Sequence, residues 1–162
     1  MNPIKDFAEK FNTNINLDPN LTIKKQNRYY LLLNQKQKQQ ITQHFYYAGT
    51  YLGKHKNQTF FPSFNLLQII AKKKKANKTT VDQKTEWLFT CKRDIFKQGI
   101  LKTTGSKRKG NYTLVLNQYG ECLGFGKITH DLDKQTKRDQ VVVKNILDIG
   151  DFLRREQKQH HL

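Results

Sequence analysis

The stretch that decides the fold is YTLVLNQYGECLGFGKI, residues 112–128. Residues 112–116 have the apolar and β-branched composition of a strand, and residues 117–120 have the polar and glycine content of a hairpin turn. Residues 121–128 then form the returning strand. Their glycines are similar to those of a phosphate-binding loop, but the Gly-Lys-Ser/Thr ending is missing, so we interpret them as sites of tight packing between strands. The segment predicts an antiparallel hairpin.

The rest of the second half adds further short strands around this hairpin. We predict strands at residues 79–81, 99–101 and 141–147, with polar loops at 103–110 and 130–139. Thr85 is expected to cap a turn over residues 86–89, and residues 148–155 are expected to close the chain as a short helix. Many short strands with one or two short helices favour a small closed barrel.

The first half mixes helices and strands. Pro3 precedes an apolar stripe at helical spacing, and a second helix is expected to begin after Pro62-Ser63 and to run to Ala71. Strands are predicted at residues 28–33, 45–53 and 59–61, whereas the pattern of 34–43 is too weak to assign. The lysine-rich segment 71–78 suggests a boundary, so we predict an α+β domain over 1–76 and a mostly-β domain over 77–162.

The chain is strongly basic. It has 162 residues, 36% of them hydrophobic, which predicts a packed core, and its formal net charge is +17. Residues 1–76 carry 13 basic and 3 acidic side chains, against 17 and 10 in residues 77–162. Such an excess suits a polyanionic partner, and nucleic acid and anionic membrane are the two candidates.

Other features favour an intracellular protein. No apolar run approaches the roughly 18 residues of a membrane span, and the first ten residues lack the apolar core of a signal peptide. Cys91 and Cys122 are too few for a disulfide framework or a zinc quartet, so we expect a reducing compartment.

Residues 77–156 resemble a PUA domain, an RNA-binding pseudobarrel. The motifs that carry this resemblance are EWLFTCKRDIF at 86–96, Gly99-Ile100, LGFG at 123–126, VVKN at 142–145 and DIGDFLRRE at 148–156. In the first half, RYY at 28–30, AGTYLGK at 48–54 and FPSFNLL at 61–67 also match. Together these motifs resemble the Nip-seven family of ribosome-biogenesis factors in its archaeal-like form, over about residues 7–156. Lys92 stands where that family usually has glycine, so we expect strained or reshaped backbone there.

No catalytic constellation is evident, and we predict a protein without enzymatic activity, cofactor or metal. None of the five histidines has metal-ligand spacing with a cysteine. Cys91 lies beside Lys92 and Arg93, which would favour a thiolate if it were exposed, but its apolar run predicts a buried thiol. Asp94 is expected to form a local salt bridge with these cations.

The resemblance implies a non-enzymatic RNA-binding factor that acts on precursor ribosomal RNA of the large subunit through its PUA domain. The first domain would contact ribosome assembly proteins or help to place the RNA. The location would be the cytoplasm in an archaeon and the nucleus or nucleolus in a eukaryote. Two alternatives remain open, an accessory subunit of an RNA-modifying enzyme and a basic protein that binds anionic membrane, although no membrane partner is expected.

The resemblance places RNA contact on the PUA domain, where eight basic residues are our candidates. Arg154 and Lys158 would share a helical face, with Arg155 directed to RNA or to Asp151. Basic residues also alternate with aromatic ones near Tyr29, Tyr51 and Tyr112, where burial in a strand is the alternative to base stacking. Lys72 to Lys75 could equally be a solvated helix end or an RNA contact. The candidate RNA-binding residues are Lys92, Arg93, Lys97, Lys102, Lys144, Arg154, Arg155 and Lys158.

Overall fold

The structure, a computed structural model, describes residues 2–41, 45, 47–151 and 154. Its first half contains a four-stranded antiparallel sheet in the order β1-β2-β3-β4 and three helices. The strands are β1 (Thr22–Lys25), β2 (Arg28–Leu31), β3 (Thr50–Lys56) and β4 (Thr59–Pro62), and the helices are α1 (Pro3–Glu9), α2 (Gln35–Gln40) and α3 (Phe64–Ala71).

The second half contains a six-stranded sheet in the order β6-β10-β9-β8-β5-β7, in which only the β5–β8 pair is parallel. Because the two edge strands β6 and β7 do not pair with each other, the sheet is a curled pseudobarrel and not the fully closed barrel that strand count suggested. Its elements are β5 (Lys78–Val81), α4 (Gln83–Thr90), β6 (Ile95–Phe96), a 3-10 turn (Lys97–Gly99), β7 (Ile100–Thr104), β8 (Tyr112–Leu116), β9 (Cys122–Ile128) and β10 (Val141–Asp148).

The hairpin at residues 112–128 is confirmed, and Gly124 and Gly126 have the packing role that the sequence suggested. Gly124 has φ +147, and a Cβ atom there would lie 1.9 Å from the carbonyl oxygen of Leu147 on β10. A side chain at this position would therefore push β10 away from β9. Close backbone approach explains the glycine, and a phosphate-binding role is not needed.

Two local predictions are wrong. Asp82 and not Thr85 caps α4: the Asp82 carboxylate accepts the Thr85 N–H at 2.7 Å, and Thr85 lies buried inside the helix. β3 begins at Thr50 and not at residue 45, because Gly49 has φ +61 and turns the chain against the Leu31 carbonyl before the strand starts. The unassigned segment after residue 34 contains α2, which Asn34 caps.

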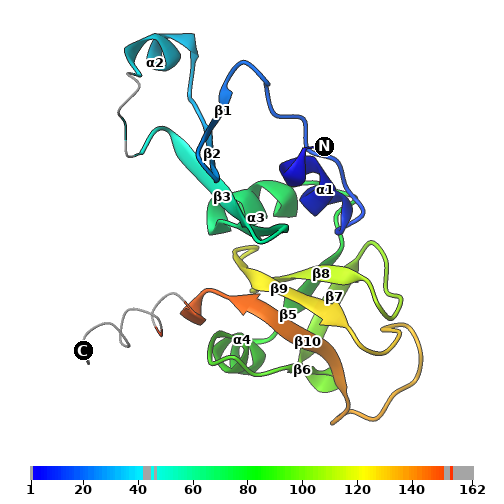
Figure 1. Ribbon diagram of the computed structural model, residues 1–162. Coiled ribbons are helices and arrows are strands. Elements are labelled where there is room, and N and C mark those ends of the chain that lie inside the picture. The colour runs from blue at the N-terminus through cyan, green and yellow to red at the C-terminus, as the bar shows by residue number, and fades with distance from the viewer. Residues whose placement is uncertain (1, 42–44, 46, 152–153, 155–162) are drawn as a thin grey trace.

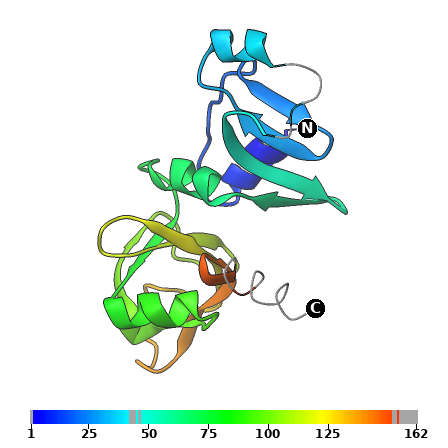
Figure 2. The ribbon, with the colours of Figure 1, turned by 90° about the vertical axis from the view of Figure 1, so that its left-hand side faces the viewer.

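The two sheets lie one above the other, with α1 and α3 between them (Figure 1). Phe7 and Phe11 from α1 and its C-terminal turn, together with Leu67 from α3, join the same buried cluster as Leu114 and Phe125 from the second sheet. A separate cluster of aliphatic side chains and Phe89 fills the pseudobarrel beneath α4, which Figure 2 shows across the front of the lower sheet. One apolar core thus crosses the sequence boundary between the halves.

The residues at the expected domain boundary are docked. Lys72 to Lys75 are exposed, but Ala76 and Asn77 are buried. The Asn77 side chain donates to the Tyr112 carbonyl at 3.0 Å and accepts the Ser106 N–H at 2.8 Å. Division into domains 1–76 and 77–162 therefore stays a prediction, and the crossing core predicts that the two halves unfold together.

Candidate nucleic-acid interface

The loop after α4 begins with a cationic residue in a left-handed conformation. Lys92 has φ +66. Its N–H donates to the Phe89 carbonyl at 3.0 Å, while the Arg93 N–H donates to the Leu88 carbonyl at 3.0 Å. This pair of bonds is the Schellman motif that usually ends on glycine. Both Lys92 and Arg93 are exposed, so the helix end presents two cations to solvent.

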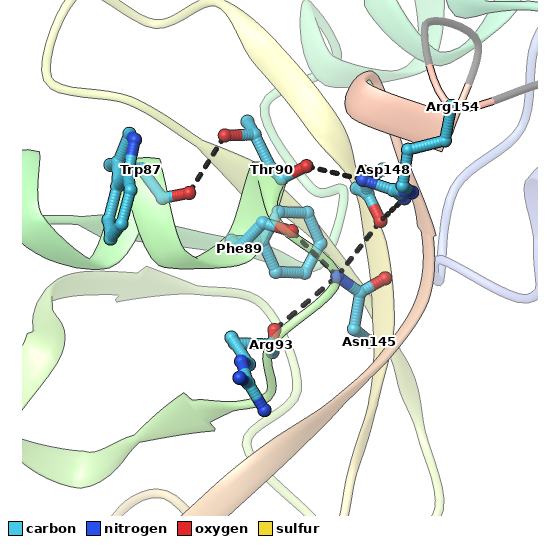
Figure 3. Close-up of polar contacts among 7 residues, drawn as sticks. All are labelled: Trp87, Phe89, Thr90, Arg93, Asn145, Asp148 and Arg154. Carbon is cyan, nitrogen blue, oxygen red and sulfur yellow. Dashed lines mark hydrogen bonds and ion pairs between the residues drawn. The ribbon is translucent and has the colours of Figure 1, made fainter. Parts of the chain in front are cut away.

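This loop is held to β10 through Asn145 (Figure 3). The Asn145 side-chain amide donates to the Phe89 carbonyl at 2.9 Å and to the Arg93 carbonyl at 3.4 Å. Its backbone N–H donates to the Asp94 carboxylate at 2.8 Å. Asp94 therefore fixes the loop to β10, and the expected salt bridge from Asp94 to Lys92 or Arg93 is not among the described contacts.

An ion pair between the buried Asp148 and the partly exposed Arg154 completes the same network. The Nη2 atom of Arg154 lies 2.9 Å from both carboxylate oxygens of Asp148, and its Nη1 atom donates to the Thr90 carbonyl at 2.7 Å. The side chain of Asp148 is 2% exposed and that of Arg154 is 32% exposed. Gly150 permits this packing, because a Cβ there would lie 2.0 Å from the Thr90 carbonyl oxygen.

Arg154 thus has a structural role that the sequence did not reveal. Its guanidinium already contacts a carboxylate and a carbonyl, so a phosphate would compete with Asp148 for the same charge. RNA contact by Arg154 stays a prediction. Arg155, Lys158 and the shared helical face of Arg154 and Lys158 lie outside the described residues.

A second group of cations follows the register of the strands. Tyr112 on β8 lies opposite Lys127 on β9, and Lys127 lies opposite Lys144 on β10. Both lysines are exposed, and neither forms an ion pair in the described part of the chain. Directly opposed like charges destabilise a sheet, so this pair favours an anionic ligand.

We call Tyr112, Lys127 and Lys144, which lie side by side on β8, β9 and β10, the lysine row. More cations lie around it. The Lys10 Nζ lies 5.7 Å from the centre of the Tyr112 ring, and the Lys127 Nζ lies 6.0 Å from it. The basic loop 107–109 lies at the same end of β9, because the Gly110 N–H donates to the Ile128 carbonyl at 2.8 Å.

The carboxylate of Asp131 lies near that loop and is already bound by other groups of the protein. Asp131 accepts the Lys109 N–H at 2.7 Å and pairs with Lys134 at 2.8 Å. These contacts hold the pKa of the Asp131 carboxyl below its usual value, first through the Lys109 N–H and then through Lys134. Asp131 therefore stays ionised and bound to the loop that Lys109 belongs to.

The remaining predicted residues are spread over the second half. Lys97 donates to the Leu132 carbonyl, and Lys102 is exposed on the edge strand β7, opposite Thr80. The structure therefore brings Lys92 and Arg93 to β10, which carries Lys144, but it leaves Lys102 at the other edge of the sheet. Lys127 and Lys10 were not predicted, since only strand pairing and the packing of α1 place them here.

The two cysteines differ in a way that corrects the sequence interpretation. Cys91 is exposed and not buried, because it is the C-cap residue of α4 and lies past the apolar part of that helix. Cys122 is buried, and burial raises the pKa of its thiol to about 12. Among the described residues, no group of three histidine, cysteine or acidic side chains has an arrangement that could hold a metal ion.

The second half of the chain has the fold of a PUA-type pseudobarrel. The family model described as the UPF0113 PUA domain matches residues 77–157, and the chain belongs to this family. A UPF0113 protein of Archaeoglobus fulgidus is 30% identical over 82 residues, which are 49% of this chain and 47% of that protein. The chain is thus similar to about half the length of that relative.

Two solved structures have the same fold over most of the chain. A conserved PUA domain protein from Thermoplasma acidophilum superposes with a TM-score of 0.60 at 19% identity, over 94% of this chain and 91% of that one. A hypothetical protein from Pyrococcus horikoshii gives a TM-score of 0.51 at 15% identity, over 81% and 77%. In the described part of this chain, no helix has the length and apolar character needed to span a membrane.

Proposed function

We propose that this protein is a non-enzymatic RNA-binding factor of ribosome assembly, which contacts precursor ribosomal RNA of the large subunit through its PUA domain. The general part of this proposal is supported by the family, since PUA domains typically bind RNA. The specific part is supported by the resemblance of both halves to the Nip-seven family.

The observation that carries the proposal is that Lys127 and Lys144 lie opposite each other on the outer face of β9 and β10, with no carboxylate bound to either among the described residues. A protein gains little by holding two ammonium groups opposite each other unless an anion lies across them. An RNA phosphate supplies that anion, and the released counterions supply binding free energy without reading the sequence. Tyr112, next in the same row, offers a ring edge or face to a neighbouring base.

The in vitro test compares two double variants of equal charge. K127Q/K144Q removes the two opposed charges and keeps a polar side chain at each position, while K36Q/K38Q makes the same change at two exposed lysines of α2. We expect K127Q/K144Q to weaken binding of a single-stranded RNA at least about tenfold more than the control does, because two ordered phosphate contacts are lost. Equal losses would show that net charge alone attracts RNA and would refute a site on this face.

The cellular test addresses the ribosomal role. Ultraviolet crosslinking in cells, followed by sequencing of the attached transcripts, should recover precursor RNA of the large ribosomal subunit with the wild-type protein. The yield should fall with K127Q/K144Q and persist with K36Q/K38Q. Recovery of transfer RNA or of guide RNA instead would overturn the ribosomal role and leave RNA binding in place.

A further inference from the structure

A pocket of about 450 Å³ lies between α1 and the first sheet. Aromatic rings form its apolar part: the ring centres of Tyr29 and Phe60 are 6.0 Å apart, and those of Phe60 and Phe7 are 5.6 Å apart. Phe7 is buried, whereas Tyr29 and Phe60 are half-exposed. The pocket thus offers ring surface that a planar apolar group can cover.

Cations stand over these rings. The Lys24 Nζ lies 5.6 Å from the centre of the Tyr29 ring, and the Lys10 Nζ lies 5.9 Å from that of Phe7. His55 also lines the pocket, and Asp6 is its acidic member. Neither Lys10 nor Lys24 forms an ion pair in the described structure. The pocket therefore combines free positive charge with aromatic surface.

The pocket continues into the lysine row. Lys10 lies over Phe7 in the pocket and also over Tyr112, which is in register with Lys127 and Lys144. Cations and rings then follow one another from the first sheet, across α1, to β10. A single-stranded nucleic acid has the matching repeat, with a phosphate and a base on each nucleotide. An acidic peptide would satisfy the cations and leave the rings unused.

We propose that this pocket is a second RNA subsite, which takes an unpaired base of the strand whose phosphates cross the lysine row. The base stacks on Tyr29 or Phe60, and Lys10 and Lys24 bind the phosphates on either side of it. The first half of the chain is then part of the RNA-binding surface. This inference rests on the proposed function, because it needs an RNA strand on the second sheet.

The charge test uses the double variant K10Q/K24Q in the full chain, with K36Q/K38Q as the matched control from the same half. For a single strand each phosphate contact contributes about 0.7 to the slope of log affinity against log salt, so K10Q/K24Q should lower the slope by about 1.4. The control should leave the slope nearly unchanged. A slope equal to that of the control would overturn the subsite.

The stacking test uses Y29L, which keeps an apolar side chain but removes the ring. A twelve-nucleotide RNA and the same strand with abasic sites are the two probes, and thermal unfolding checks that the variant folds. The wild-type protein should prefer the RNA with bases by about tenfold, and Y29L should lose most of that preference. Equal binding of the two strands by the wild-type protein would refute base stacking.

The outcomes separate this inference from the proposed function. If wild-type protein does not bind either strand, both fail. If K127Q/K144Q weakens binding while K10Q/K24Q and Y29L behave as their control, the lysine row binds RNA and the pocket does not. If polyglutamate displaces RNA as well as unlabelled RNA does, the surface does not select a nucleic acid over an acidic chain, and the proposal is wrong.

Discussion

Replacing Lys92 with glycine should give a more stable protein than replacing it with alanine, and both replacements should weaken RNA binding. Its φ of +66 lies in the left-handed region, where the backbone conformation of a residue with a Cβ is about 1–2 kcal/mol less favourable than that of glycine. About 0.5–1 kcal/mol of this advantage of glycine is offset, because glycine has more conformational entropy to lose from the unfolded chain. We therefore expect K92G to be more stable than K92A by about 0.5–1 kcal/mol.

Alanine is the matched reference because both variants lose the same positive charge at the C-terminal end of α4. For a chain of this length, 1 kcal/mol corresponds to about 2–4 °C in melting temperature, so K92G should melt about 1–4 °C above K92A. Differential scanning calorimetry of the two variants measures this difference.

The same pair of variants tests the role of the Lys92 charge in RNA binding. If the ammonium group contacts a phosphate, K92G and K92A should weaken binding equally, and each should lower the salt slope by about 0.7. The reasoning is refuted if K92A is as stable as K92G, since the left-handed conformation then has no cost. It is also refuted if K92G binds RNA as the wild type does, since the charge is then not used.

Three further predictions concern the scaffold. A thiol reagent should modify Cys91 in the native protein and leave Cys122 unmodified. Cys122 is buried, and its thiol, with a pKa of about 12, stays protonated at neutral pH. Two fast-reacting thiols would contradict this prediction. R154M should lower the free energy of unfolding by about 3 kcal/mol in urea titrations, because it leaves the Asp148 charge buried and unpaired. The double variant D148N/R154M should recover part of this loss. A loss below about 1 kcal/mol for R154M would disprove the role of the pair. Trp87 fluorescence and far-ultraviolet circular dichroism should report one coincident unfolding transition, since the apolar core spans both halves; two separate transitions would show independent domains.

Much of the second half was predictable because its signals are local. The hairpin around residues 117–120 and the strand of β10 depend on short runs of apolar residues and on turn chemistry, which the sequence displays directly. The helix stripes of α1 and α3 were predictable for the same reason. The exposure of Cys91 was missed, because an apolar run does not reveal at which residue the helix ends.

The site was less predictable because its parts are far apart in the sequence. Lys127 belongs to the candidate site because the strand register places it opposite Lys144. Lys10 belongs to it because the packing of α1 brings its Nζ over the Tyr112 ring. Arg154 was predicted from charge as an RNA contact, but charge cannot reveal the buried Asp148 that it pairs with. Family resemblance placed the candidate RNA contacts in the second half of the chain, and nonlocal contacts show which of its cations lie together.

The most direct test of the central claim is the salt dependence of single-stranded RNA binding by K127Q/K144Q beside K36Q/K38Q and the wild-type protein. The opposed lysines predict that K127Q/K144Q lowers the slope of log affinity against log salt by about 1.4, with the control close to wild type. Identical slopes for the two double variants would contradict the claim that the outer face of β9 and β10 is an RNA-binding site.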